Sequence, residues 1–296
     1  MRVALLRPSG IGIVRDDGIV AVSGALAARG VLGADAGMIE LITRFDEIRG
    51  LVGDVAAQGA ATPVDASQLL PPVPRPSKIW AAASNYRRGA AGLDSATGRG
   101  AAVSTAREDL LEMAFLKPPS AITGPEGQVV IPPGVDTIFP ELELCVVIGR
   151  EARNLTREQA LDAVFGYTII LDVTARRPAS SPAGQIGSRN VRKGYETFAP
   201  IGPWITTRDE IADPQNLNMR LWVNGELKQS ASTDGMINGV VELVTYLSHV
   251  GTLLPGDLIA TGNPDAPDFQ QKLVPGDVLR AEIEKIGSMD LYVAAA

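Results

Sequence analysis

The segment FPELELCVVIGR, residues 139–150, predicts a β-strand because two kinds of side chain alternate along it. Successive side chains of a strand point to opposite faces, so Glu141, Glu143 and Cys145 should share one face. Leucine, valine and isoleucine side chains fill the other face. Two neighbouring carboxylates on an inward-facing surface repel each other and lose hydration, and a divalent cation relieves both costs. The alternative is a strand at the rim of a sheet, with both glutamates in water.

A third acid occurs in the next strand-like segment, GYTIILDVTAR, residues 166–176. Asp172 follows a run of β-branched and aliphatic residues, and aspartate is depleted in strands unless it has a specific role. Two glutamates and one aspartate would form an all-oxygen site, which suits Mg²⁺ or Mn²⁺ and leaves positions for water and a chelating substrate. The spacing suggests this site without deciding it.

The remaining pattern predicts an α+β chain that is mostly β, with a mixed or antiparallel sheet and few helices. Runs rich in valine and isoleucine end at glycine, proline or asparagine, as strands do. Helices are expected at residues 156–164 and 239–250. The other strand-like runs are QVVIPP at 128–133, LNMRLWVNG at 217–225, GDLIATG at 256–262 and GDVLRAEIEKIG at 276–287.

Residues 1–72 are expected to form a small N-terminal domain, followed by a catalytic domain over residues 73–296. The first part combines short apolar runs and turns with a helical pattern at 37–52. The proline-dense segment QLLPPVPRPSKIW, residues 68–80, is typical of a connector. Residues 84–114 begin rich in glycine, alanine, serine and arginine and then become helical. They are interpreted equally well as a mobile surface loop or as an active-site lid.

The composition narrows the class of protein. The chain has 296 residues, 45% hydrophobic and 21% charged, as is ordinary for a globular protein. The net charge of −7 and the lack of a basic run argue against a nucleic-acid partner. No apolar run reaches the roughly 18 residues of a membrane span. One cysteine excludes an intrachain disulfide, and the first residues do not resemble a signal peptide, so we expect a cytoplasmic protein.

Several segments, in order between about residues 80 and 286, resemble the fumarylacetoacetate hydrolase superfamily. Besides the two acidic segments they are FLKPPSAITGP, RKGYETFAPIGPWI, VNGELKQ and LLPGDLIATGNP. The resemblance implies a mixed β-roll with a small N-terminal domain, usually dimeric. It implies Mg²⁺ or Mn²⁺ at Glu141, Glu143 and Asp172. It also implies a small anionic substrate, a 2-oxo acid or a 1,3-dicarbonyl compound, that chelates the metal.

The resemblance further makes Lys193, in RKGYETF, the cation beside a developing enolate. An oxyanion between a divalent metal and an ammonium group in a dry pocket is strongly stabilised, so we favour this role over that of a surface lysine. Arg87 and Arg88 of the lid segment are either carboxylate-binding residues or ordinary loop arginines. Expected substrate-binding residues, from segments that carry the resemblance, are also Tyr167, Thr261 and Asn263.

The chain also departs from the family's pattern. The lid motif N-Y-x-x-H-x-x-E retains Asn85 and Tyr86 but has Gly89 and Gly92 in place of the histidine and glutamate. In the motif N-D-V-T-A-R-D-x-Q the chain retains an aspartate, threonine and arginine, while leucine, arginine and alanine replace Asn, Asp and Gln. Asn263 replaces a threonine. The single histidine, His249, is expected at a helix C-terminus, away from the substrate.

These departures bear on the reaction. Water attack on a carbon–carbon bond needs a general base, and losing one costs about 10²–10⁴-fold in rate. We therefore predict a metal-dependent enzyme that works through an enolate, by decarboxylation, isomerisation, tautomerisation or C–C cleavage. Hydrolysis of an acylpyruvate remains open if a metal-bound hydroxide attacks or if a lid acid is the base. A non-catalytic ligand-binding protein and a purely structural one also remain. The candidate lid acids are Asp94, Glu108, Asp109 and Glu112.

Overall fold

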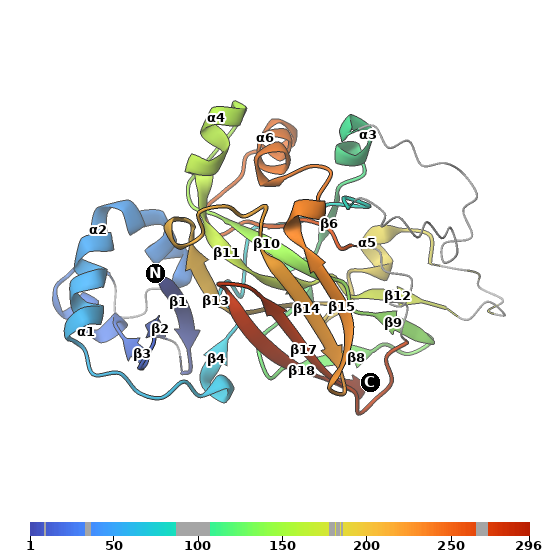
Figure 1. Cartoon of the computed structure of the whole chain (residues 1–296), viewed down its shortest axis with the longest axis horizontal. Coiled ribbons are helices and arrows are strands. Elements are labelled where there is room, and N and C mark those ends of the chain that lie inside the picture. Colours follow the sequence, from blue (N-terminus) through green and yellow to red (C-terminus); the bar gives the residue numbers. More distant parts are fainter. Residues whose placement is uncertain are drawn as a thin grey trace.

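The computed structural model describes residues 1–8, 10–32, 37–86, 107–177, 181, 184, 186–264 and 272–296. Strands dominate it, and each segment that the sequence marked as strand-like contains a strand. β10 (Leu142–Ile148) and β11 (Val164–Leu171) are buried along their whole length and lie in the middle of the molecule (Figure 1). The predicted fold class, mixed and mostly β, is confirmed.

The largest sheet has eleven strands and contains β10 and β11. Most neighbours are antiparallel, but β16 pairs with β5, and β13 with β7, in parallel. The path across the sheet is β3 (Gly18–Ala21), β2 (Gly10–Arg15), β1 (Arg2–Leu6), β13 (Ala199–Thr207), β11, β10, β16 (Leu258–Ala260), β5 (Ile79–Ala81) and β6 (Phe115–Lys117). Off this path, β4 (Leu69–Leu70) pairs with β1, and β7 (Ile122–Thr123) with β13.

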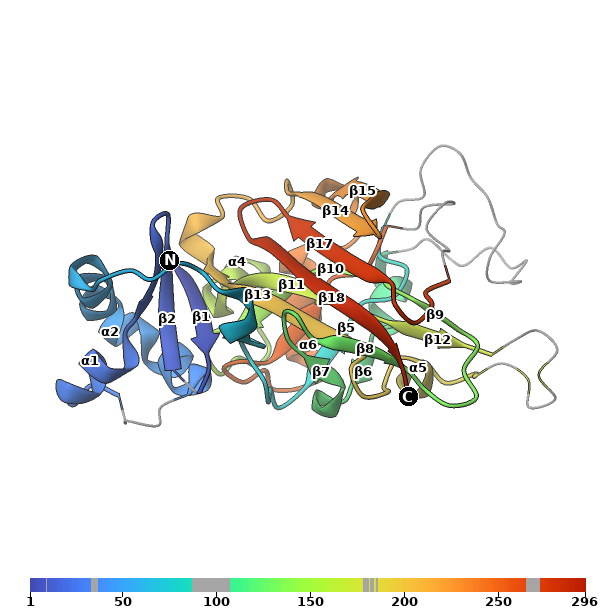
Figure 2. The same ribbon diagram turned by 90° about the horizontal axis from the view of Figure 1, so that it is seen from below.

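A second sheet of five strands packs across the first (Figure 2). Its order is β15 (Glu226–Ser232), β14 (Asn218–Val223), β17 (Val278–Ile283), β18 (Gly287–Ala295) and β8 (Gln128–Ile131). Leu144 and Val146 of β10 meet Met219, Leu221 and Leu279 of this sheet in one hydrophobic cluster. The core between the sheets therefore fixes which face of β10 points away from the second sheet. A separate pair joins β9 (Thr137–Phe139) to β12 (Thr174–Arg176).

Helices are few and mostly short. The expected helix at 239–250 is present as α6. The one at 156–164 is an α-helix only over its first part, continues as a 3₁₀ turn and gives way to β11 at Val164. Among the described residues, no helix combines the length and apolarity needed to cross a membrane. The α-helices are α1 (Ser23–Ala28), α2 (Met38–Gln58), α3 (Arg107–Glu112), α4 (Arg157–Ala160), α5 (Arg189–Arg192) and α6 (Val240–Val250). The 3₁₀ turns are η1 (Ala66–Gln68), η2 (Pro119–Ala121), η3 (Leu161–Ala163), η4 (Arg208–Glu210) and η5 (Thr233–Gly235).

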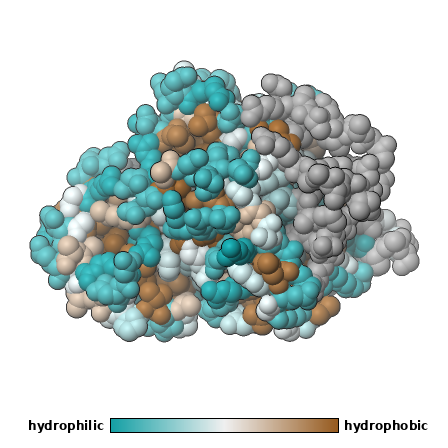
Figure 3. Space-filling model, viewed as in Figure 1, coloured by the Kyte–Doolittle hydropathy of each residue, from teal (hydrophilic) through white to brown (hydrophobic). Residues whose placement is uncertain are grey.

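The surface in the view of Figure 3 is mainly hydrophilic, with apolar residues in separate patches. The larger exposed apolar side chains come from different elements, for example Leu227 of β15, Val250 of α6 and Tyr292 of β18. Scattered apolar residues of this kind are normal on a protein surface.

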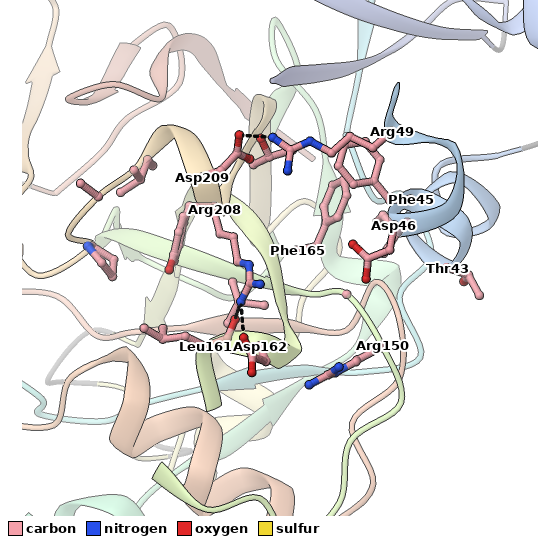
Figure 4. A pocket seen from close by; sticks show the side chains of 18 residues that line it. Thr43, Phe45, Asp46, Arg49, Arg150, Leu161, Asp162, Phe165, Arg208 and Asp209 are labelled. Atoms are coloured by element: carbon pink, nitrogen blue, oxygen red, sulfur yellow. Dashed lines mark hydrogen bonds and ion pairs between the residues drawn. The ribbon is translucent and has the colours of Figure 1, made fainter. Parts of the chain in front are cut away.

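The N-terminal segment is continuous with the main sheet. Its first strand, β1, pairs with β13, and Phe45 of α2 packs edge-on against Phe165 of β11, with ring centroids 4.9 Å apart. Arg49 and Asp209 form an ion pair of 2.5 Å beside a cavity of about 380 Å³, which lies between α2 and the main sheet (Figure 4). The division into domains at residue 72 stays a prediction, but the two parts share one sheet and one core.

Candidate metal centre and active site

Three carboxylates gather where β10 begins and β11 ends. Antiparallel pairing places Glu143 opposite Ile170, and the Asp172 N–H donates a 2.8 Å hydrogen bond to the Glu141 carbonyl. One oxygen from each of Glu141, Glu143 and Asp172 lies within 4.8 Å of the others. The structure therefore brings together the three acids that the sequence singled out. Their role as metal ligands is a proposal.

Burial of ionised carboxylates is energetically unfavourable unless a positive charge lies beside them. Glu143 and Asp172 are almost inaccessible to solvent, and Glu141 is partly exposed. Burial, and next the negative charge of Asp172, raise the pKa of Glu143 well above its usual range. The Gly262 N–H donates a 2.6 Å hydrogen bond to the Glu143 carboxylate, which partly offsets this effect.

Lys193 supplies positive charge directly at the acids. It follows α5, and its Nζ donates to Oε2 of Glu141 at 2.5 Å and to Oδ2 of Asp172 at 2.6 Å. Burial would lower the pKa of Lys193, but the charges of Asp172 and Glu141 outweigh burial and raise it. The ammonium also lies 5.4 Å from the centre of the Phe115 ring. Lys193 is thus held charged beside the acids, as its predicted role requires.

A second lysine, Lys117, adds positive charge beside the acids and was missed by the sequence reasoning. It ends β6, is fully buried, and forms a 2.7 Å ion pair with Oδ1 of Asp172. Its ammonium also donates to the backbone carbonyl of Lys193. Burial lowers the pKa of Lys117, although Asp172 counteracts this effect. The available signal was a lysine in an apolar strand directly before two prolines.

Asp172 lies between the two lysines, and their charges determine its state. Burial would raise the pKa of its carboxyl, but the ammonium groups of Lys117 and Lys193 outweigh burial and lower it. Three carboxylates against two ammonium groups leave the cluster with a negative charge when all are ionised. A bound divalent cation would reverse that sign and favour an anionic ligand. The donor set, all carboxylate oxygen, fits Mg²⁺ or Mn²⁺.

Residues after β16 border the acids. The Thr261 hydroxyl is fully buried and donates to the Leu144 carbonyl at 2.9 Å, so it supports the backbone. Asn263 is partly buried, and its Nδ2 donates to the Leu142 carbonyl at 3.2 Å, between the two glutamates in sequence. The Thr261 hydroxyl is thus engaged with the backbone, and the substrate-binding role of Asn263 stays a prediction.

The prediction for Tyr167 is corrected by the register of β11. Tyr167 pairs with Val146, whose side chain points to the face opposite that of Glu143. The Tyr167 ring lines the cavity of Figure 4, and its pKa is raised by burial. It therefore points away from the acids.

The entrance to the lid segment is described as far as Tyr86. Asn85 is buried, and its Nδ2 donates to the carbonyls of Asn238 and Thr261 at 2.7 and 2.8 Å. It ties the start of this segment to the strand end beside the acids. The predictions for Arg87, Arg88, Gly89, Gly92 and Asp94 lie outside the described residues, as does the side chain of Glu108. Asp109 and Glu112 are exposed on α3.

His249 lies at the end of α6, as expected, and its Nε2 is 3.0 Å from the carbonyl oxygen of Leu155. This partner belongs to the loop before α4 and not to the last turn of α6. This contact gives His249 a structural partner well outside the acid cluster.

A comparison with protein-family models shows to which family this chain belongs. Residues 78–294 match the model of the C-terminal domain of fumarylacetoacetate (FAA) hydrolase. The chain belongs to the fumarylacetoacetate hydrolase family. The three acids, Lys193 and Lys117 all lie within the matched residues.

Several relatives of this chain are enzymes. Maleylpyruvate hydrolase of Aquipseudomonas alcaligenes is 34% identical over 296 residues, covering 99% of each chain. A mitochondrial oxaloacetate tautomerase of Bos taurus is 35% identical over 238 residues, 79% of this chain and 71% of the relative. The crystal structure of maleylpyruvate hydrolase from Sphingobium sp. SYK-6, in complex with manganese(II) and pyruvate, is 35% identical, covers 100% of both chains and has a TM-score of 0.80. The present chain is thus an enzyme of the fumarylacetoacetate hydrolase family.

Proposed function

We propose that this protein is a divalent-metal-dependent enzyme that stabilises the enolate of a small 2-oxo acid or 1,3-dicarbonyl compound. The observation that carries the proposal is the cluster of Glu141, Glu143 and Asp172, with the ammonium of Lys193 hydrogen-bonded to two of its three acids. A divalent cation, when bound, supplies Lewis-acid polarisation and a rigid template for two neighbouring substrate oxygens. The chain itself contributes the remaining charges.

Lys193 is the residue that we place beside the reacting oxygen. Its pKa is raised, so it stays protonated and can donate a hydrogen bond as negative charge develops on that oxygen. Lys117 approaches Asp172 from its other oxygen and also binds the Lys193 carbonyl, so it fixes both partners. Burial of both lysines excludes water from this side of the site, which strengthens each charge interaction.

Proton transfer between the keto and enol forms, or loss of CO₂ from a β-oxo acid, is the reaction that we favour. Both pass through an enolate, and neither needs a base to activate water. The likeness to an oxaloacetate tautomerase supports this class. The replacement of the lid's expected histidine and glutamate by Gly89 and Gly92 supports it as well.

Hydrolysis of an acylpyruvate is the second candidate. It is favoured by the likeness, over essentially the whole chain, to two maleylpyruvate hydrolases. This reaction requires a substitute for the histidine of the family motif. The substitute is either a metal-bound hydroxide or one of the lid acids Asp94, Glu108, Asp109 and Glu112.

Further properties belong to the same proposal. We infer Mg²⁺ or Mn²⁺ as the metal because the donors are all carboxylates, and manganese occurs in the structure of the Sphingobium relative. Arg87 and Arg88 are proposed to bind a substrate carboxylate, and Asn263 is proposed to contact another part of the substrate. A homodimer and a cytoplasmic location remain predictions, the first from the family resemblance and the second from the sequence.

Proton NMR of purified protein with oxaloacetate and with maleylpyruvate, each with and without Mg²⁺ or Mn²⁺, tests the proposal. Metal-dependent tautomerisation or decarboxylation of oxaloacetate without cleavage of maleylpyruvate supports the favoured reaction. Metal-dependent cleavage of maleylpyruvate supports the second candidate and directs mutagenesis to the four lid acids. Turnover of either compound at an equal rate in excess EDTA would overturn the metal-dependent mechanism.

A further inference from the structure

Two side-chain amides form a short chain of hydrogen bonds beside the three acids. Gln229 belongs to β15 of the second sheet and is 2% exposed. Its Oε1 accepts a 3.2 Å hydrogen bond from Nδ2 of Asn263. The same Nδ2 donates to the Leu142 carbonyl, and the preceding residue, Gly262, donates its N–H to Glu143. The amide of Asn263 is thus held between the second sheet and the start of β10, beside Glu141 and Glu143.

These contacts fix the orientation of the Asn263 amide. A primary amide has two N–H hydrogens, and here both are directed to acceptors, the Leu142 carbonyl and Oε1 of Gln229. The reverse orientation would place Oδ1 of Asn263 against the Leu142 carbonyl, with two acceptors facing each other. Among the contacts of the described residues, the side-chain atom of Asn263 that remains for a ligand is therefore Oδ1, an acceptor.

The orientation of Gln229 follows from the same logic. If its amide were reversed, its NH₂ group would face the NH₂ group of Asn263. In the observed orientation, Nε2 of Gln229 is buried, and within the described ranges it meets no hydrogen-bond acceptor. A buried donor without a partner is costly and uncommon. The hydrogen bond from Asn263 to Oε1 of Gln229 gives a reason for this orientation of the Gln229 amide.

We propose that Gln229 is a positioning residue, which holds Asn263 so that the site offers a hydrogen-bond acceptor to the substrate. A site of this kind prefers a small acid whose oxygen next to the carboxylate carries a hydrogen, as in an enol or an alcohol, over one with a bare carbonyl. A threonine hydroxyl at position 263 could donate or accept, whereas this amide only accepts. The inference rests on the proposed function and adds a preference for the enol form.

The test compares two probes of equal charge and similar size. Pyruvate carries a carbonyl next to its carboxylate, and L-lactate carries a hydroxyl at the same carbon. Their dissociation constants are measured by calorimetry on the Mn²⁺-loaded protein, for the natural chain, Gln229→Met and Gln229→Glu. Methionine fills a similar volume without an amide oxygen. Only the Leu142 carbonyl then holds the Asn263 amide, which can turn its N–H groups to the ligand at the loss of that one hydrogen bond. Glutamate keeps an oxygen that accepts from Nδ2.

We expect the ratio of the lactate constant to the pyruvate constant to rise about tenfold in Gln229→Met, since one neutral hydrogen bond is gained or lost. Gln229→Glu should keep the ratio of the natural chain, because its extra negative charge weakens the binding of both monoanions by the same factor. Unchanged Mn²⁺ affinity and melting of the metal-free protein show that the fold is intact. If Gln229→Met does not fold, Asn263→Ala replaces it. In that variant the dissociation constant of lactate should rise about tenfold, and that of pyruvate should stay unchanged.

The outcomes separate the two levels of the proposal. If both probes bind and their ratio is the same in all variants, the positioning role of Gln229 is wrong while the oxo-acid site stands. A ratio that changes equally in Gln229→Met and Gln229→Glu also overturns it, because loss of packing then suffices. If Mn²⁺ binds but neither probe does, the proposed function fails, and the preference built on it fails too.

Discussion

Asp172 is the residue at which the charges of the site converge. Each of its two carboxylate oxygens is paired with a different lysine, and both lysines are buried. A buried ion pair is weak evidence for stability, but removing one partner strongly destabilises the folded protein, because the remaining charge is buried without compensation. The two lysines therefore have separable roles, since Lys117 is fully enclosed and Lys193 also reaches the more exposed Glu141.

Replacing Lys117 by methionine tests its role at Asp172. We expect Lys117→Met to lower the free energy of unfolding by roughly 3–5 kcal/mol, because Asp172 would remain buried with one partner fewer. Urea denaturation measures the change. The matched control is Lys272→Met, which breaks the exposed 3.1 Å pair with Asp136 and should cost at most about 1 kcal/mol. Equal effects of the two substitutions would contradict the account of Lys117.

Replacing Lys193 separates catalysis from metal binding. Lys193→Met removes the hydrogen bonds to Glu141 and Asp172 but leaves all three acids. We expect the turnover number to fall about 10²–10³-fold, as for loss of one group that stabilises an oxyanion. The rise in melting temperature with Mn²⁺ should persist. Full activity in this variant would remove Lys193 from the mechanism.

The sequence revealed some of these residues and concealed others for physical reasons. The acids stood out because glutamate and aspartate are unusual within apolar strands, and Lys193 followed from the family resemblance. Lys117 and Gln229 did not stand out, because their partners come from distant strands and only sheet packing brings them together. Tyr167 was assigned to the site, but its side chain lies on the opposite face of the sheet from Glu143. Side chains alternate between the faces, and Tyr167 pairs with Val146, three residues after Glu143.

At the scale of elements, β13 is one of the strands that the periodicity missed. It contains Pro200 and Pro203, and a proline is normally found in edge strands because it lacks an N–H. Yet β13 lies inside the main sheet, between β1 and β11. Its pairing with β11 shifts register between Tyr167 and Ile169, and the Thr168 hydroxyl donates to the Gly202 carbonyl at 3.0 Å. A side chain thus supplies a hydrogen bond near the interrupted ladder.

Close approach of β11 to β13 makes Gly166 sensitive to substitution. A Cβ atom at Gly166 would lie 2.3 Å from the Thr206 carbonyl oxygen, which is part of the backbone and cannot move aside alone. We expect Gly166→Ala to destabilise the protein by about 1–3 kcal/mol, measured by urea denaturation. The control, Gly50→Ala, adds a methyl group in open space on α2 and should stabilise by about 0.5–1 kcal/mol. A neutral Gly166→Ala would mean that the strands lie further apart.

At the scale of the whole molecule, the N-terminal segment is built into the main sheet. β1 covers the edge of β13, and apolar residues of α2 share a core with Phe165, Ile201 and Ile205. The sequence showed the proline-dense connector and the change of pattern near residue 72. It could not show that the strands on both sides would join, because strand pairing depends on contacts between residues about 200 positions apart.

Deleting residues 1–72 tests this integration. We expect the fragment 73–296 to lose cooperative thermal unfolding and to aggregate, because the edge of β13 and its apolar neighbours become exposed. Circular dichroism during heating and size-exclusion chromatography measure the result. A soluble fragment that melts cooperatively would show instead that the catalytic part folds alone, as the predicted domain division implies.

The most direct test of the central claim is a calorimetric titration of Mn²⁺ into the natural chain and into Glu143→Gln, with Glu47→Gln as an exposed control. Glu143 is buried among the acids, whereas the Glu47 side chain is 71% exposed. The account predicts one Mn²⁺ per chain in the natural protein and in Glu47→Gln, with about 2.7 kcal/mol of added stability at a hundredfold excess over the dissociation constant. Glu143→Gln should lose this site. Equal Mn²⁺ binding by all three proteins, or binding by none, would contradict the claim that Glu141, Glu143 and Asp172 form the metal centre.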